Sequence, residues 1–365
     1  MGKAVKEHLA RALNSHLNSI HETFQVLYET PASSLEKVTW EEVVQMGEQL
    51  SKQATVAGML WTGEAPDVNQ LEENMGSYFN MLQGFLLLSH GSTVGAGPTL
   101  RSNIHASAKQ VVDCSLALLK EAVSSYGSHD ANQKRSIPPL AGAVWDACIA
   151  LKKTPTTNYT AIGRAITQVA VSLKDVLREM KELKPGTTDP ADKISDETAS
   201  DPAGDPPEDD DSSEGDLGND LSLEEMKIAQ STIDVVSNTL AVIKELIRYI
   251  TGLLKQSSPN GGSHSVDSLE KLLKICQGIG IQVDELGACL YPPQEIPALK
   301  AAAGKITNEI KEMQAEVRNL KGPSEGFFQA CEGLENSVRK LEAELDCSSD
   351  AADLAPQMQN LDLSV

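Results

Sequence analysis

Residues 9–27 read LARALNSHLNSIHETFQVL, and their pattern predicts an amphipathic helix. Large apolar side chains recur at intervals of three and four positions: Leu9, Leu13, Leu17, Ile20, Phe24 and Leu27. Because an α-helix completes a turn in about 3.6 residues, these side chains share one face, which must be buried against other helices. Pro31 ends this helix, since proline lacks the backbone N–H that a helix interior requires.

The next part of the chain repeats this kind of pattern. Ser33 and Glu36 have the spacing of a capping box, which predicts a second helix from Ser33 to about Trp61. Further helices are predicted over about 67–90, 98–126, 134–153 and 156–183, separated by short segments rich in Gly, Ser and Pro. Six helices with short connections predict an antiparallel bundle over residues 1–184.

Composition changes abruptly between Pro185 and Leu221, where thirteen Asp and Glu stand against Lys193 alone. This stretch therefore carries −12 of the net charge of −21, and it has too few apolar side chains to offset backbone entropy. It is predicted to be a disordered acidic linker over 185–221. Ser212 and Ser213 lie in the acidic context that acidophilic kinases prefer, so they are predicted phosphorylation sites.

A second bundle is predicted to begin at Ser222, which forms a capping box with Glu225. The first helix runs to about 255, and others are predicted over about 266–290, 294–320 and 324–346, giving a four-helix bundle over 222–346. Residues 347–365 are predicted to be a flexible tail. Its apolar residues have the spacing of a leucine-rich nuclear export signal, which is a hypothesis for Leu354, Met358, Leu361 and Leu363.

Hydrophobic residues make up 40% of the chain and aromatic residues only 4%, so the cores must be filled by aliphatic side chains, as suits helices. Small residues within the helices, as in AIGRAI at 161–166, let helices approach closely and resemble the bundles of talin and vinculin. The predicted fold class is all-α, with two antiparallel bundles joined by a disordered acidic linker.

Charge and residue spacing argue against several functional classes. The acidic balance disfavours nucleic acid and anionic membranes as partners, because both require clustered Lys and Arg. The six cysteines are scattered without a C-x-x-C pair, which predicts no metal site. The Gly-rich residues 91–97 follow no strand and precede no G-K-[ST], so no phosphate site is expected. We therefore expect neither an enzyme nor a cofactor.

Two short motifs carry a resemblance to a known family. Val144-Trp145-Asp146-Ala147-Cys148 and Leu290-Tyr291-Pro292-Pro293, with the acidic stretch between them, resemble the cyclin-D-binding proteins, also called Grap2- and cyclin-D-interacting proteins, here as a plant member. The resemblance covers roughly residues 35–345. It implies an all-α protein of nucleus and cytoplasm that binds D-type cyclins and helix-loop-helix transcription factors and restrains cell-cycle progression. It also implies a helix-loop-helix region without a basic segment, hence no direct binding of nucleic acid.

The resemblance does not identify which residues contact a partner. Trp145, Cys148, Tyr291, Pro292 and Pro293 carry the motifs, but a large aromatic on a bundle helix is more often core than contact, and the proline pair is expected to end a helix. The zipper-like spacing of Leu334, Val338, Leu341 and Leu345 covers fewer than two heptads, which favours a buried stripe. Two alternatives stay open: a talin-like cytoskeletal adaptor and an acidic chaperone for basic proteins.

Overall fold

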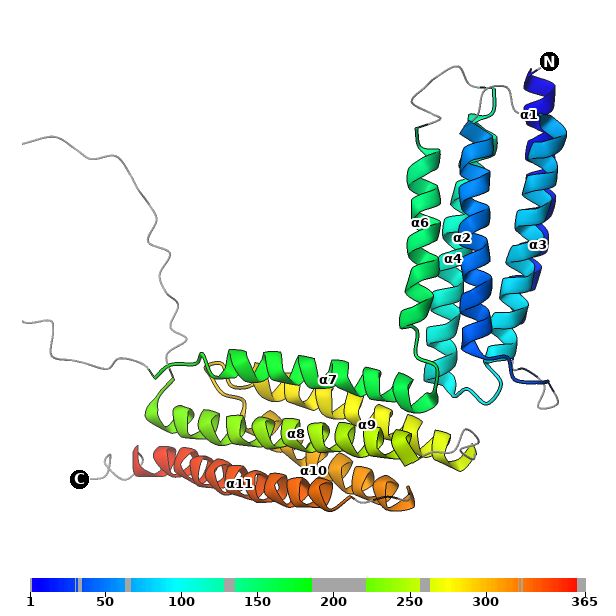
Figure 1. Ribbon diagram of the computed structural model, residues 1–365. Coiled ribbons are helices and arrows are strands. Elements are labelled where there is room, and N and C mark those ends of the chain that lie inside the picture. Colours follow the sequence, from blue (N-terminus) through cyan, green and yellow to red (C-terminus); the bar gives the residue numbers. More distant parts are fainter. Residues whose placement is uncertain are drawn as a thin grey trace, which may run out of the picture. The chain divides into compact units, whose positions relative to one another are not determined.

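The computed structural model describes residues 2–29, 31, 35–62, 67–127, 135–185, 221–256, 263–320, 322 and 324–359. Over these residues the chain consists of helices and their connections, which confirms the all-α prediction (Figure 1). The helices form two compact units. Unit 1 comprises Met1–Arg164 and Ser257–Glu270, and unit 2 comprises Ala165–Gln256 and Lys271–Val365.

Unit 1 is built mainly from five α-helices: α1 (Gly2–Val26), α2 (Trp40–Thr62), α3 (Val68–Ser92), α4 (Pro98–Ser125) and α6 (Ile137–Ala150). A 3-10 turn, η1 (Leu151–Lys153), follows α6, and the unit also takes in the first turns of α7 (Asn158–Met180) and α9 (Ser263–Ala288). Helix α2 packs against α3 and α6, and α1 packs against α3 and α4. Their apolar stripes close a core that includes Trp61, Tyr78, Phe79 and Phe85.

The start of α2 corrects one prediction. The backbone N–H of Thr39 donates to Glu42 Oε2 at 2.8 Å, and the N–H of Glu42 donates to Thr39 Oγ1 at 3.3 Å. These reciprocal hydrogen bonds form a capping box, so the helix begins at Trp40 and the box predicted at Ser33 and Glu36 is wrong. Glu36 lies outside any helix, and Ser33 lies outside the described residues.

Unit 2 contains α8 (Leu223–Gln256), α10 (Ile296–Asn319) and α11 (Glu325–Gln359), together with most of α7 and α9. Helix α11 packs along α8 and α10. The capping box predicted at Ser222 and Glu225 is confirmed, with N–H donors 2.9 and 3.2 Å from their acceptors. A Cβ placed at Gly280 would lie 3.5 Å from Val169, and one at Gly287 would lie 3.1 Å from Val176, so α7 packs closely on α9.

Helix α7 is therefore a fifth helix of unit 2, although the sequence placed it in the first bundle. Its buried side chains Leu173, Leu177 and Met180 help to close the second core. Periodicity shows that a helix has an apolar face, but not which neighbour covers that face. Unit 1 accordingly ends at Arg164 and unit 2 begins at Ala165, both within α7, while the domain boundary predicted at residue 184 stays a prediction.

The acidic stretch also has a different place from the one predicted. The N–H of Leu221 donates to the carbonyl of Lys184 at 3.2 Å, and Pro185 forms an isolated bridge with Leu221. Both ends of residues 186–220 thus lie in unit 2, so the stretch connects α7 to α8 and does not run from one unit to the other. Ser212 and Ser213 lie outside the described residues, and their modification stays a prediction.

Helix α11 extends further than expected. The sequence predicted its end at residue 346, but its backbone is helical to Gln359, although Pro356 lies within the extension. Leu354 and Met358 lie on this extension, whereas Leu361 and Leu363 lie outside the described residues. Leu334, Val338, Leu341 and Leu345 are buried, as expected of a bundle stripe.

Candidate interaction surfaces

Trp145 is a surface residue of α6. Its indole Nε1 donates to Thr55 Oγ1 of α2 at 3.1 Å, and the side chain is 41% exposed. The expectation that this aromatic belongs to the core is therefore wrong. Helix α6 turns Ala141, Val144 and Cys148 inward, and Trp145 lies at the edge of that stripe, where only part of its ring is covered.

Helices α2 and α6 run antiparallel, and three contacts fix their register. Lys152 Nζ lies 2.9 Å from Glu48 Oε1, Trp145 pairs with Thr55, and a Cβ at Gly58 would lie 3.5 Å from Ala141. Along this seam the buried indole of Trp40 also donates to the carbonyl of Leu151 at 2.9 Å, which ties the end of α6 to the start of α2. These contacts tie α2 to α6, and Figure 1 shows the two helices side by side.

Exposed apolar side chains lie on both helices of this seam. The exposed fractions are 50% for Val56, 71% for Met59, 41% for Trp145 and 57% for Ile149. We call these four residues the Trp145 face. Neighbouring apolar side chains left in water are characteristic of a surface that binds another protein, and Trp is enriched among the residues that dominate such binding. The Lys152–Glu48 ion pair supplies a polar border.

Three members of this face were missed at the sequence level, although a signal was present. The buried residues of α2 include Val43, Leu50, Ala54 and Ala57, and both Val56 and Met59 are out of phase with that stripe. Ile149 is likewise out of phase with the buried residues of α6. Large apolar side chains off the buried stripe of two adjacent helices would have indicated the face, but the adjacency of α2 and α6 is tertiary information.

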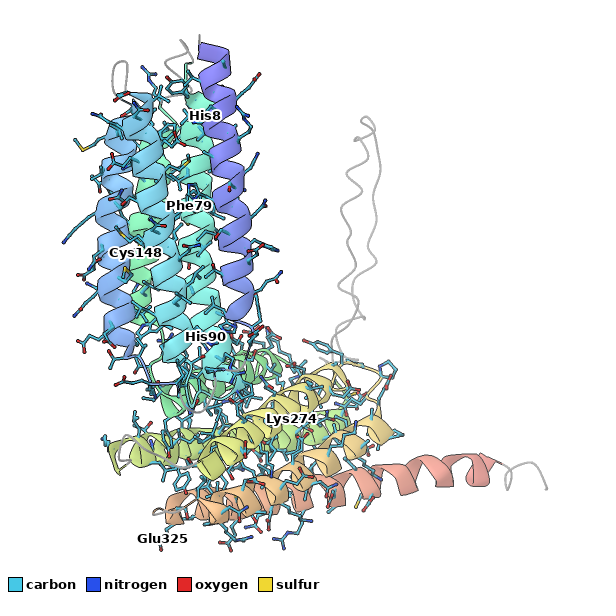
Figure 2. All side chains as sticks on the ribbon, turned by 90° about the vertical axis from the view of Figure 1, so that its right-hand side faces the viewer. His8, Phe79, His90, Cys148, Lys274 and Glu325 are labelled. Atoms are coloured by element: carbon cyan, nitrogen blue, oxygen red, sulfur yellow. The ribbon has the colours of Figure 1, made fainter. Side chains whose placement is uncertain are left out.

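Cys148, the other residue of the first motif, is a buried core residue of unit 1 (Figure 2). Burial raises the pKa of its thiol to about 12, so the thiol stays protonated at neutral pH. Cys276, Cys289 and Cys331 are also buried, and none of these four forms a disulfide. Their place agrees with the prediction that they act as small apolar core residues.

The second motif lies in unit 2, in the connection between α9 and α10. Tyr291 is 45% exposed, so the core expectation is wrong here too. Its side chain borders a pocket of about 290 Å³ with Met180, the last residue of α7, and Leu183, which follows it. Helix α9 ends at Ala288, before Pro292 and Pro293, and the peptide bond between the two prolines is cis.

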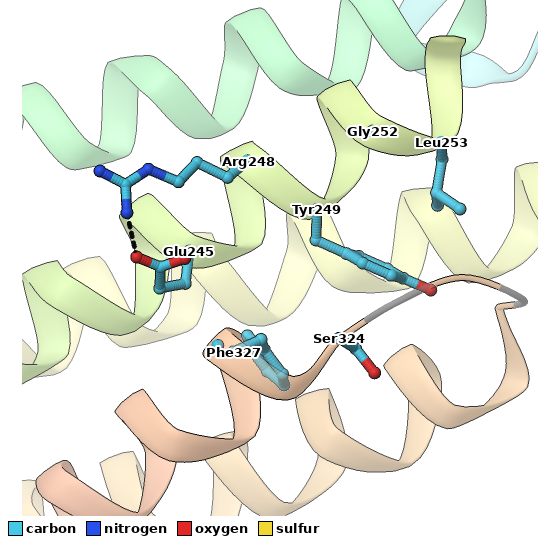
Figure 3. Close-up of a pocket in the computed structure, with 8 residues that line it drawn as sticks. Glu245, Arg248, Tyr249, Gly252, Leu253, Ser324 and Phe327 are labelled. Atoms are coloured by element: carbon cyan, nitrogen blue, oxygen red, sulfur yellow. Dashed lines mark hydrogen bonds and ion pairs between the residues drawn. The ribbon is translucent and has the colours of Figure 1, made fainter. Parts of the chain in front are cut away.

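A smaller pocket in unit 2, of about 190 Å³, lies where α8 meets the start of α11 (Figure 3). Its charged groups already pair with each other, Arg248 with Glu245. The hydroxyl of Tyr249 donates to the carbonyl of Leu320 at 2.9 Å. The polar side chains here thus serve the packing of unit 2, and the pocket is a weaker candidate for binding than the Trp145 face.

The described residues contain no group of three His, Cys, Asp or Glu side chains arranged to hold a metal ion. No helix in the described ranges combines the length and the apolar character that a membrane crossing requires. The exposed features of these ranges that stand out are apolar, and they suit the binding of another protein.

Comparison with known proteins finds two family models that match this chain, and the first includes the whole of α7. The family model described as "Grap2 and cyclin-D-interacting, N-terminal" matches residues 42–186, and its C-terminal counterpart matches residues 207–315. The first range includes the whole Trp145 face and the second includes Tyr291. Helix α1 and the whole of α11 lie outside both ranges.

Two relatives are named as homologues of cyclin-D1-binding protein 1. The one from Xenopus laevis is 23% identical over 224 residues, which cover 61% of this chain and 62% of the relative. The one from Danio rerio is 22% identical over 242 residues, or 66% of each chain. The match thus spans slightly less than two thirds of either relative, and the plant origin expected from the motifs stays a prediction. With both of its domain models matched in order, this chain belongs to the family of Grap2- and cyclin-D-interacting proteins.

Proposed function

We propose that this chain is a non-enzymatic regulator of cell-cycle progression that binds a D-type cyclin through the Trp145 face. The observation that carries the proposal is the exposure of Val56, Met59, Trp145 and Ile149 together on α2 and α6, within the range matched by the family model. The family description supplies the class of partner, a D-type cyclin.

The chemistry of the face fits a helical partner. A partner helix can bury Met59 and Ile149 on either side of the indole, and apolar side chains at intervals of three or four residues fit a seam between two helices. Met adapts its shape to the partner, while the ring of Trp145 is fixed by its bond to Thr55 before binding. A partly pre-ordered anchor costs less conformational entropy when the complex forms.

The test compares the two aromatic residues of the family motifs. Trp145→Ala and Tyr291→Ala remove side chains of similar exposure, one from unit 1 and one from unit 2. Isothermal titration of a purified D-type cyclin should show that Trp145→Ala lowers affinity by at least about 10-fold, as expected of a central aromatic contact. Tyr291→Ala should change it by less than about 2-fold. Equal losses in both variants, or no binding by the unaltered chain, would refute the proposal.

Helix-loop-helix transcription factors are included in the proposal as a second class of partner, because their amphipathic helices offer the same apolar spacing. Such a factor and the cyclin should compete for the unaltered chain, and Trp145→Ala should bind neither of them.

Two experiments separate this function from the alternatives. A cytoskeletal adaptor would sediment with actin filaments, whereas a cyclin-binding regulator should stay in the supernatant. An acidic chaperone would lose its binding when residues 186–220 are deleted, whereas cyclin binding should persist.

We also propose that the protein resides in both nucleus and cytoplasm. Imaging of the tagged chain with and without residues 354–365 tests this, since loss of an export signal should raise the nuclear fraction.

A further inference from the structure

The pocket of about 290 Å³ in unit 2 that Tyr291 borders lies where α7 and α9 end, and we call it the Tyr291 pocket. The two helices lie side by side (Figure 1), and a Cβ placed at Gly287 of α9 would lie 3.1 Å from Val176 of α7. Gly287 has no side chain to fill the space, and the apolar side chains of Val176, Met180 and Leu183 line it. A hollow of this volume accommodates one large side chain of a partner rather than a whole helix.

The charged residues that line the Tyr291 pocket are both acidic. Glu179 comes from α7 and Asp284 from α9, and both side chains are exposed. The ion pairs found in the described part of unit 2 use other carboxylates. Lys181 and Lys184, which follow α7, are exposed but do not line the pocket. Two carboxylates without a cation beside them favour a positively charged occupant.

The acidic stretch strengthens this preference, because both of its ends join the chain beside the pocket. Leu183 lines the pocket, and the next residue, Lys184, accepts a hydrogen bond from the N–H of Leu221 at 3.2 Å. Asp189 follows Leu183 by six residues, which is at most about 20 Å of extended chain. The stretch has a net charge of −12. A charge of this size attracts a cationic segment to this end of unit 2 and speeds its encounter with the pocket.

An arginine side chain matches the apolar walls, the acidic groups and the aromatic border of the pocket. Its methylene stem can pack on the walls while its guanidinium donates to carboxylates. The planar face of the guanidinium stacks on aromatic rings, and Tyr291, which is 45% exposed, supplies such a ring. Lysine has the same charge, but its ammonium lacks the planar fork of donors that can serve Glu179 and Asp284 together.

We propose that the Tyr291 pocket binds an arginine side chain in a basic segment of a partner protein. The acidic stretch attracts the segment, and the pocket selects its arginine. This site belongs to unit 2 and the Trp145 face to unit 1, and the proposal does not depend on the binding of a cyclin. It gives the second family motif a role in recognition through Tyr291.

Fluorescence anisotropy with labelled synthetic peptides tests the proposal on the full chain. One peptide reads Ala-Lys-Ala-Arg-Ala-Lys-Ala, and the matched peptide has lysine in place of the arginine, so both carry the same charge. The unaltered chain should bind the arginine peptide at least about 3-fold more tightly than the lysine peptide. Glu179→Gln with Asp284→Asn should lower affinity for the arginine peptide by at least about 5-fold and remove most of the preference.

Two exposed carboxylates of α11 provide the matched control. Glu332→Gln with Glu342→Gln removes the same charge from unit 2 and should change affinity for the arginine peptide by less than about 2-fold. Tyr291→Ala should reduce the preference for arginine over lysine, because the stacking surface is lost. Equal binding of the two peptides by the unaltered chain overturns the proposal, as does a loss in the Glu179 and Asp284 variant no larger than in the control.

A variant of the acidic stretch separates selection by the pocket from simple attraction of charge. Replacing every Asp and Glu of residues 186–220 by Asn or Gln keeps the length of the connection and removes its carboxylates. Affinity for both peptides should fall at low ionic strength, because the attracting charge is lost, whereas the preference for arginine should remain. Disappearance of the preference in this variant would assign recognition to the stretch and overturn the role of the pocket.

Discussion

The two units treat their exposed apolar residues differently. In unit 1, Val56 and Met59 are exposed on α2 and Trp145 and Ile149 on α6, and Trp145 bonds to α2 through Thr55. In unit 2, the exposed apolar side chains Val171, Leu223 and Ile281 come from three helices, α7, α8 and α9, and Tyr291 lies in the connection after α9. Single exposed apolar residues are ordinary on protein surfaces, whereas a contiguous group indicates a binding site. The comparison teaches that both units are built alike inside, whereas Trp145, the one exposed aromatic of the first family motif, lies on unit 1 within the face proposed for binding.

Because both interiors are close-packed, truncation of a core side chain in either unit should give the largest predicted effect, a loss of stability. Phe85 in unit 1 and Phe327 in unit 2 are both fully buried. Replacing either by Ala should lower the free energy of unfolding by about 3–5 kcal/mol, because each leaves a cavity in a close-packed core. Denaturant unfolding followed by circular dichroism measures the loss. Hydrogen exchange should place it in the unit that carries the change, and a loss spread evenly over both units would contradict the division described here.

If only the exposed apolar face of unit 1 binds the cyclin, substitutions of exposed residues in the two units should differ in their effect on affinity. Ile149 on the Trp145 face and Ile281 on α9 are exposed isoleucines of similar accessibility, 57% and 65%. Ile149→Ala should weaken cyclin binding by about 5- to 10-fold, and Ile281→Ala by less than about 2-fold. Neither should change the free energy of unfolding by more than about 0.5 kcal/mol, since both side chains are largely in water. Equal binding by the two variants would remove the distinction between the units.

The two units also differ in how a buried polar side chain is hydrogen-bonded, and the expected effects on stability are smaller. In unit 1 the hydroxyl of Tyr78 donates to Ser115 Oγ at 3.0 Å, and both residues are fully buried. Burial raises the pKa of Tyr78, which keeps this hydroxyl protonated and able to donate. Tyr78→Phe should cost about 1 kcal/mol in the free energy of unfolding, because Ser115 is left without this partner. Restoration of most of that loss by Ser115→Ala in the double variant is the control.

Unit 2 offers the opposite case in Glu309 on α10, whose Oε2 is buried without a hydrogen-bond partner among the described residues. Burial, with the charge of Glu312, raises the pKa of this carboxyl above its usual value. Folding therefore disfavours its ionised form, and the unfavourable contribution is present at neutral pH and relieved as pH falls through the raised pKa. Glu309→Gln should raise the melting temperature slightly at pH 7, with the gain shrinking as pH falls toward 4.5. A gain independent of pH would exclude the charge as its cause.

Much of the helix plan was predictable, because the spacing of apolar residues is a local property. Helix α4 was predicted over 98–126 and spans Pro98–Ser125, and α10 was predicted over 294–320 and spans Ile296–Asn319. The start of α2 was misplaced because two S/T-x-x-E patterns occur six residues apart, and the helix begins at the second, where Thr39 and Glu42 form both hydrogen bonds. The exposure of Trp145 was missed because a motif carries no information on which side of a stripe its aromatic will lie.

The sequence by itself determined that this chain is helical, where most helices begin and end, and to which family it belongs. Each of these properties depends on residues close together along the chain, or on their order. Only the tertiary structure decided that α7 packs with unit 2, that both ends of the acidic stretch meet, and that α2 and α6 bring four apolar residues together. An amphipathic helix must bury its apolar face somewhere, but several partners satisfy that requirement equally in sequence, and packing in three dimensions selects one.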